Sequence, residues 1–194
     1  MAGCSYMIEL EIQFDKDKYQ EMIARATLFN KDIDKAVSRA ARRAAEAGKS
    51  ETKRQMAGEY TLPSSDIGKT IEVKPLGEGM EMRIFSGVQD ILAFRGVKPK
   101  TPGPSGSGRV IVEIKKGNKF DIERGFIGKL QKGQKRIGVY QRDAVQNNVL
   151  RRYHGPTTVG MFKANETVHN AAIEKIMETL DKRMIHELER LFNG

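Results

Sequence analysis

Hydrophobic and polar residues alternate along residues 5–14, near the N-terminus. Apolar side chains occupy the even positions of this stretch, and Glu9 and Glu11 stand among the odd ones. A period of two predicts a β-strand with one buried face. Asp15 or Asp17 follows and can cap a short helix after the strand.

A longer helix is predicted from a cap at Asn30 to about Gly58, because apolar residues recur there at spacings of three and four. At its centre these residues are alanines, such as Ala40, Ala41 and Ala44. Alanine has the highest helix propensity, but its small side chain buries little area. We therefore expect the backbone of this helix to lie close to a neighbouring element. Its opposite face is rich in Lys, Arg and Glu, and we interpret that face as a solvated surface.

The C-terminal part of the chain predicts an amphipathic helix. Asn165 can cap it, and apolar side chains follow at spacings of three and four between residues 173 and 191. Met177 belongs to this apolar stripe. We expect this stripe to pack against the rest of the protein.

Strand-like runs fill the middle of the chain. Residues 71–74 and 80–85 flank a glycine-containing turn and predict a hairpin. Residues 96–108 contain three of the six prolines and four glycines, a composition that predicts an exposed, mobile loop. Further strands are predicted at residues 109–115, 120–122 and 136–140.

These elements together predict an α+β fold, with a mainly antiparallel sheet packed against a long Ala-rich N-terminal helix and an amphipathic C-terminal helix. A length of 194 residues suits a single domain over residues 1–194. Hydrophobic residues make up 39% of the chain and charged residues 30%, which is typical of a soluble globular protein. No apolar run approaches the roughly 18 residues of a membrane span. One cysteine, Cys4, excludes an internal disulfide framework.

Positive charge is concentrated in the middle of the sequence. The net charge is +9, yet residues 1–94 and residues 153–194 each carry a net charge of −1. Residues 95–152 hold 15 Lys or Arg and four Asp or Glu, a net charge of +11. Such a segment can attract nucleic acid, an anionic surface or an acidic protein partner.

Motifs for catalysis or cofactor binding are not evident in the sequence. Gly68-Lys69-Thr70 matches the end of a phosphate-binding P-loop, but Pro63 stands where that motif needs a glycine, and a predicted helix precedes it instead of a strand. The histidines are too far apart for a metal-binding motif. We therefore expect no catalytic residue, cofactor or metal, and predict that the protein is not an enzyme. The three histidines are His154, His169 and His186.

The basic segment contains the candidate contact residues. Its cations are interleaved with Phe120, Phe126 and Tyr140, a pattern that would allow phosphate contacts and base stacking. The other interpretation is that these cations flank strand ends and keep a sheet soluble. We define the candidate basic surface as Lys115, Lys116, Lys119, Lys129, Lys132, Lys135, Arg136, Arg151 and Arg152.

The order of several short patterns resembles the prophage minor tail protein Z family of tailed bacteriophages. The resemblance covers residues 31–192 and depends on the succession of patterns, since no single motif is diagnostic. The patterns are KAVSRAARRAAEA at residues 35–47, YTLP at 60–63, DILAF at 90–94, RGFI at 124–127, IGVYQR at 137–142 and YHGPTTV at 153–159.

This resemblance implies a structural protein of the virion. Its members act in tail completion and head–tail joining, so the implied partners are other tail or connector proteins and further copies of the chain. The implied location is the head-proximal end of the tail, after synthesis in the bacterial cytoplasm, with no membrane contact. Residues 95–152 would then face an acidic neighbour or the DNA path, and the loop at 96–108 would become ordered against the next subunit. Sequence-independent binding of nucleic acid by residues 95–152 is the alternative function.

Overall fold

The computed structural model describes residues 7–13, 15, 17–28, 32–77, 79–85, 89–100, 109–129, 137–143, 146 and 149–193. The predicted α+β class is confirmed, with two long helices packed together and antiparallel sheets. In chain order the elements are β1 (Met7–Ile12), η1 (Asp17–Tyr19), α1 (Gln20–Leu28), α2 (Ile33–Glu59), α3 (Ser64–Gly68), β2 (Ile71–Leu76), β3 (Gly79–Phe85), η2 (Ile91–Ala93), β4 (Lys98–Lys100), β5 (Arg109–Glu113), β6 (Lys119–Glu123), β7 (Gly125–Gly128), β8 (Gly138–Arg142), β9 (Leu150–Tyr153), α4 (Thr158–Lys163) and α5 (Glu166–Asn193).

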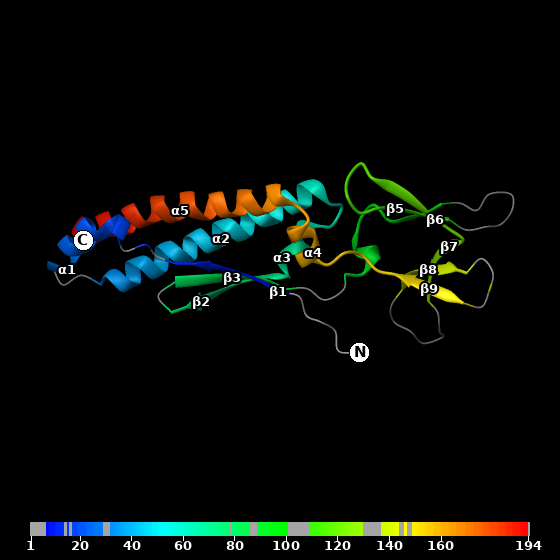
Figure 1. Cartoon of the computed structure of the whole chain (residues 1–194), viewed down its shortest axis with the longest axis horizontal. Helices are drawn as coiled ribbons and strands as arrows, with labels where there is room; N and C mark the ends of the chain where they lie inside the picture. The colour runs from blue at the N-terminus through cyan, green and yellow to red at the C-terminus, as the bar shows by residue number, and fades with distance from the viewer. Residues whose placement is uncertain are drawn as a thin grey trace.

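The molecule is elongated and has two parts (Figure 1). In the first part, which we call the body, α2 and α5 lie side by side over a sheet of strand order β1-β3-β2. In the second part, the β end, strands β4 to β9 form two further sheets of orders β4-β5-β6 and β7-β8-β9. The mainly antiparallel sheet predicted from the sequence is thus divided into three sheets of three strands each.

Helix α2 begins later than predicted. Asp32 caps it, and the Asp32 side chain accepts a hydrogen bond from the backbone N–H of Lys35. The predicted cap, Asn30, lies outside the described residues. The C-terminal helix follows its prediction, because the Asn165 side chain accepts a bond of 3.3 Å from the Val168 N–H. Helix α2 has 27 residues and helix α5 has 28.

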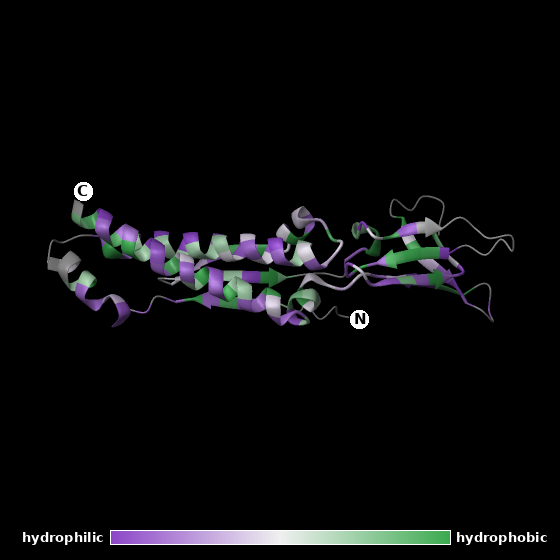
Figure 2. Cartoon of the chain, turned by 90° about the horizontal axis from the view of Figure 1, so that it is seen from above, coloured by the Kyte–Doolittle hydropathy of each residue, from purple (hydrophilic) through white to green (hydrophobic). Residues whose placement is uncertain are grey.

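The alanine stripe brings the two long helices close together. Ala40, Ala41, Ala44 and Ala45 are buried along α2, as the sequence predicted. At Gly48 an added Cβ would lie 2.4 Å from Cγ1 of Ile176 on α5, so the helices leave no room there for a side chain. Figure 2 shows hydrophobic and hydrophilic segments alternating along both helices, as expected for helices that are buried along one side.

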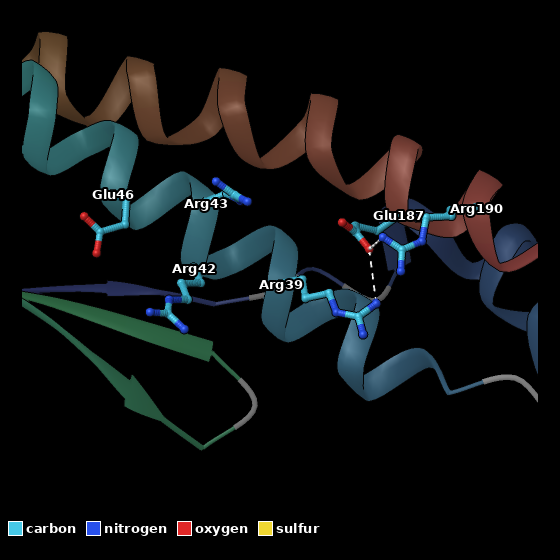
Figure 3. A pocket seen from close by; sticks show the side chains of 6 residues that line it. All are labelled: Arg39, Arg42, Arg43, Glu46, Glu187 and Arg190. Carbon is cyan, nitrogen blue, oxygen red and sulfur yellow. Dashed lines mark ion pairs between the residues drawn. The ribbon is translucent and has the colours of Figure 1, made fainter.

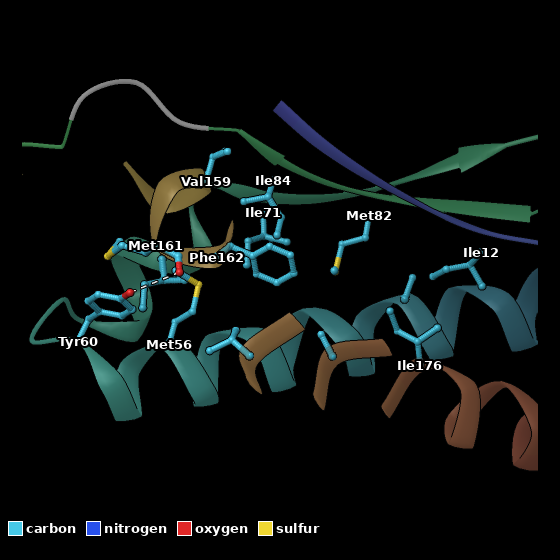
Figure 4. Packing of buried hydrophobic residues seen from close by; sticks show 14 of the residues in the cluster. Ile12, Met56, Tyr60, Ile71, Met82, Ile84, Val159, Met161, Phe162 and Ile176 are labelled. Atoms are coloured by element: carbon cyan, nitrogen blue, oxygen red, sulfur yellow. Dashed lines mark hydrogen bonds between the residues drawn. The ribbon is translucent and has the colours of Figure 1, made fainter. Parts of the chain in front are cut away.

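The core of the body lies between α2 and the sheet. Met82 and Ile84 of β3 point toward α2, and Phe162 of α4 lies between them and Met56 (Figure 4). The hydroxyl of Tyr60 donates a bond of 3.4 Å to the carbonyl of Met161 at the edge of this core. The hairpin predicted near residues 71–85 is present as β2 and β3, with Gly77 in the left-handed conformation at its turn (φ 55°).

A second core holds the β end together, and hydrogen bonds join this end to the body. Val110, Val112 and Val139 are buried there, and the partly buried Val97 and Ile114 contact both cores. Two backbone hydrogen bonds also cross the joint between the two parts. The N–H of Thr61 donates to the carbonyl of Ile114, and the N–H of Lys116 donates to the carbonyl of Glu59. The single domain over residues 1–194 stays a prediction.

The segment predicted as one loop, residues 96–108, is partly a strand. Lys98–Lys100 form β4, which pairs with β5 in the register Lys98↔Ile111. Pro99 is compatible with this strand because β4 lies at the edge of its sheet. The interpretation as a loop is therefore wrong for these three residues, and residues 101–108 lie outside the described part of the chain.

Candidate protein interaction site

The nine residues of the candidate basic surface do not form one cluster. Lys132, Lys135 and Arg136 lie outside the described residues. The other six divide into two groups, one at the joint between the two parts and one on the sheet β7-β8-β9. The first group is Lys115, Lys116 and Lys119, and the second is Lys129, Arg151 and Arg152.

The cations at the joint have partners within the molecule. The Lys115 ammonium lies 3.5 Å from a carboxylate oxygen of Glu59 at the end of α2. Lys116 donates a bond of 2.8 Å to the carbonyl of Ala57, in the last turn of the same helix, where a cation is favoured by the helix dipole. Lys119 lies 3.7 Å from Glu113 on β5. Lys115 and Lys116 therefore help to fix the β end to the body, whereas the Lys119 pair lies within the β end.

The cations on β7-β8-β9 are interleaved with aromatic residues, as predicted, but the rings of Phe126 and Tyr140 are already covered, whereas Phe120 on β6 is exposed. The rings of Phe126 and Tyr140 lie 5.8 Å apart, and the Arg142 guanidinium lies 5.3 Å from the Phe126 ring. Tyr140 is only 2% exposed and cannot stack on a base. Arg152 lies 3.7 Å from Asp90, whereas Arg151 is exposed and forms no ion pair with any described residue.

The charged face of α2 forms part of a hollow of about 660 Å³ with the end of α5 (Figure 3). Arg39 and Arg190 both approach the carboxylate of Glu187, at 3.6 and 3.9 Å. Figure 3 shows Arg42 directed toward the sheet and Arg43 directed toward α5, so the arginines do not converge on one point. The geometry agrees with the predicted solvated face better than with an anion site.

An apolar groove of about 390 Å³ lies between β1 and α5. Strand β1 is at the edge of its sheet, with β3 on one side and no described strand on the other. The groove therefore runs beside backbone N–H and C=O groups that have no partner in the sheet. Its lining residues are Leu10, Glu11, Ile12, Gln13, Asp15, Lys18, Tyr19, Ile173, Ile176, Met177, Leu180 and Asp181.

Met177 gives this groove an exposed hydrophobic residue. Met177 is 60% exposed, although it belongs to the apolar stripe that the sequence predicts to pack against the rest of the protein. The apolar stripe of α5 is wider than the side of the helix that α2 covers, so one edge of the stripe borders the groove. The buried residues Ala172, Ile176 and Met184 form the side of α5 that faces the core. The sequence signal for the site was that the apolar stripe extends beyond this buried side.

One end of the groove is fixed by a hydrogen-bonded cluster. Asp181 of α5 accepts a bond of 2.7 Å from the Tyr19 hydroxyl, and the Lys18 ammonium lies 2.6 Å from the same oxygen. Burial and the neighbouring Asp181 raise the pKa of Tyr19, and the hydrogen bonds from Lys18 and Tyr19 lower the pKa of Asp181. With Glu11 and Asp15 nearby, the rim of the groove is mainly acidic at neutral pH.

The described residues include no group of three or more His, Cys, Asp or Glu placed to hold a metal ion. None of the described helices is long and apolar enough to cross a membrane. Comparison with known proteins identified no matching family, no matching curated protein and no matching solved structure.

Proposed function

We propose that the chain is a structural virion protein of a tailed bacteriophage or prophage that acts in tail completion and head–tail connection as part of a ring. The observation that carries this proposal is the open edge of β1 beside the apolar groove and the exposed Met177. Unpaired strand edges and exposed apolar surface favour contact with another protein. The neighbours in this proposal are other tail or connector proteins and further copies of the chain.

The positions that carry the family resemblance support the proposal at the level of the fold. In the described residues these patterns contribute buried side chains to both cores, among them Ala44, Phe94 and Val159 in the body and Val139 in the β end. The inferred virion role follows from this resemblance together with the open edge.

Sequence-independent binding of nucleic acid remains the second proposal. Lys129, directly after β7, and Arg151 on β9 favour it, since both are exposed and form no ion pair with a described residue. The protein role is favoured because Lys115, Lys119 and Arg152 are each close to a carboxylate, which reduces the positive field available to phosphates.

Electron microscopy of particles from a phage with a stop codon at Tyr6 tests the proposal. We expect free heads beside separate tails, or joined particles that fail to deliver DNA, with rescue by the intact gene supplied from a plasmid. Normal, infectious particles from the stop-codon phage would refute the virion role.

A further inference from the structure

We propose that the groove between β1 and α5 receives strand β9 of a second copy of this chain, so that β1 and the incoming β9 form one continuous sheet across the two copies. This inference rests on the proposed ring and names the contact that builds it.

Two edge strands are excluded as partners by proline. The described sheets have six edges, because each has three strands. Strand β2 contains Pro75 and β4 contains Pro99. Proline has no N–H to donate, and natural proteins use it at edges to prevent pairing. Strand β1 has no proline, so each of its six residues has a backbone N–H group. It also has no lysine, the residue that most often blocks pairing at an exposed edge.

Charge decides among the remaining edges. Strand β1 presents Glu9 and Glu11, which disfavours pairing with a second β1 because like charges would face each other. Strand β6 carries Asp121 and Glu123 and meets the same objection. Strand β7 has four residues with glycine at both ends and no charged side chain, so it offers no charge to complement Glu9 and Glu11 of β1.

Strand β9 is the described edge whose charge complements β1. Its sequence is Leu-Arg-Arg-Tyr, and both arginines are exposed. The outer edge of β9 has no described strand beside it, as its sheet order is β7-β8-β9. Opposite charges across a strand pair stabilise the pairing, and complementary potentials also speed association.

The side chains of β9 match both sides of β1. Successive residues of a strand point to opposite faces, so Arg151 and Arg152 lie on different faces of the new sheet. Arg151, which forms no ion pair with a described residue, then meets Glu9 and Glu11 on the outer face. Arg152, which lies 3.7 Å from Asp90 of its own copy, lies on the side of the groove, where Met177 supplies apolar contact.

The contact is heterologous, because β1 belongs to the body and β9 to the β end (Figure 1). A heterologous contact leaves a free β9 on one copy and a free β1 on the other, and repetition gives a ring when the rotation closes. This is the symmetry that the proposed function requires.

Charge reversal tests the contact directly. Glu11→Lys and Arg151→Glu change exposed side chains that form no ion pair with described residues, so both variants should keep the thermal stability of the wild type. Light scattering after size exclusion should show the wild type as an oligomer. Each single variant should dissociate about tenfold more readily, and the double variant should return to within about threefold of the wild type. Lys129→Glu changes an exposed cation that follows β7, at the opposite edge of the same sheet from β9; it is the matched control and should behave as wild type.

A double variant weaker than either single variant would overturn the inference, as would a wild-type chain that stays monomeric at every concentration tested. Supplying the variants to the stop-codon phage separates the two proposals. A defective stop-codon phage that both single variants rescue fully would refute the β1–β9 contact and retain the virion role. Normal stop-codon particles would refute the virion role, while charge-swap rescue in solution would still support the contact.

Discussion

Replacing Gly48 by alanine tests whether close contact between α2 and α5 determines the packing of the body. A Cβ at this position would lie 2.4 Å from Cγ1 and 2.6 Å from Cδ1 of Ile176. Carbon atoms in contact are about 3.5–4.0 Å apart, so the Ile176 side chain must move by about 1 Å. Ile176 is only 6% exposed and lines the groove between β1 and α5, so a shift of its side chain disturbs buried packing.

The expected cost follows from two opposing effects. Overpacking of a core site costs about 1–3 kcal/mol. Alanine is favoured over glycine inside a helix by about 1 kcal/mol, which offsets part of that cost. Gly58, also on α2, is the matched control because an added Cβ there meets nothing within 4 Å. We expect Gly58→Ala to stabilise the protein by about 0.5–1 kcal/mol and Gly48→Ala to be about 2 kcal/mol less stable than this control.

Urea unfolding followed by circular dichroism at 222 nm measures both changes, provided that the two variants have the same m-value. For a chain of this size the difference corresponds to about 4–8 °C in Tm. In an Ile176→Ala background the clash is removed, and Gly48→Ala should become stabilising. If Gly48→Ala were as stable as Gly58→Ala in the wild-type background, the proposed contact between the helices would be wrong.

Three further predictions concern a titrating pair, a helix cap and the basic surface. Hydrogen bonds from Arg54 lower the pKa of Glu51 from its usual 4.5 to about 2. The unfolded chain thus binds more protons between these values, and the stabilisation, complete above pH 4.5, is lost as the pH falls toward 2. Glu51→Gln should flatten this dependence of the unfolding free energy; an unchanged slope would contradict the assignment. Thr157 accepts a bond of 3.0 Å from the Gly160 N–H at the start of α4, so Thr157→Ala should cost about 1 kcal/mol in urea unfolding, and no loss would show that the cap is dispensable. If the chain binds DNA, affinity in a fluorescence-anisotropy titration should fall steeply with added salt and drop further in Lys129→Gln; salt-independent binding would exclude a phosphate-based mode.

The main body elements could be predicted from the sequence because their signals are local. Strand β1 repeats with a period of two, and its buried residue Ile12 lies on the predicted face. The alanine stripe of α2 and the cap at Asn165 follow from helical spacing and from a side chain that reaches a nearby N–H. Each of these signals is contained within a few turns or residues, so no distant contact is needed to read it.

Short strands of the β end were harder to predict. Strands β7 and β9 have four residues each, too few to show a period, and β4 contains a proline. Their conformation depends on pairing with β8 and β5, which are non-local partners. The left-handed Arg124 (φ 55°), which directs the chain from one sheet to the next, has no sequence signal of its own.

The sequence by itself determined the α+β class, the two long helices and the concentration of positive charge in residues 95–152. Only the tertiary structure decided which cations have carboxylate partners, that Met177 is exposed and that an open strand edge borders a groove. The reason is physical: helix and strand periods depend on neighbours in the chain, whereas exposure and charge pairing depend on which distant surfaces pack together. The candidate site belongs to the second kind, since β1 and α5 come from opposite ends of the chain.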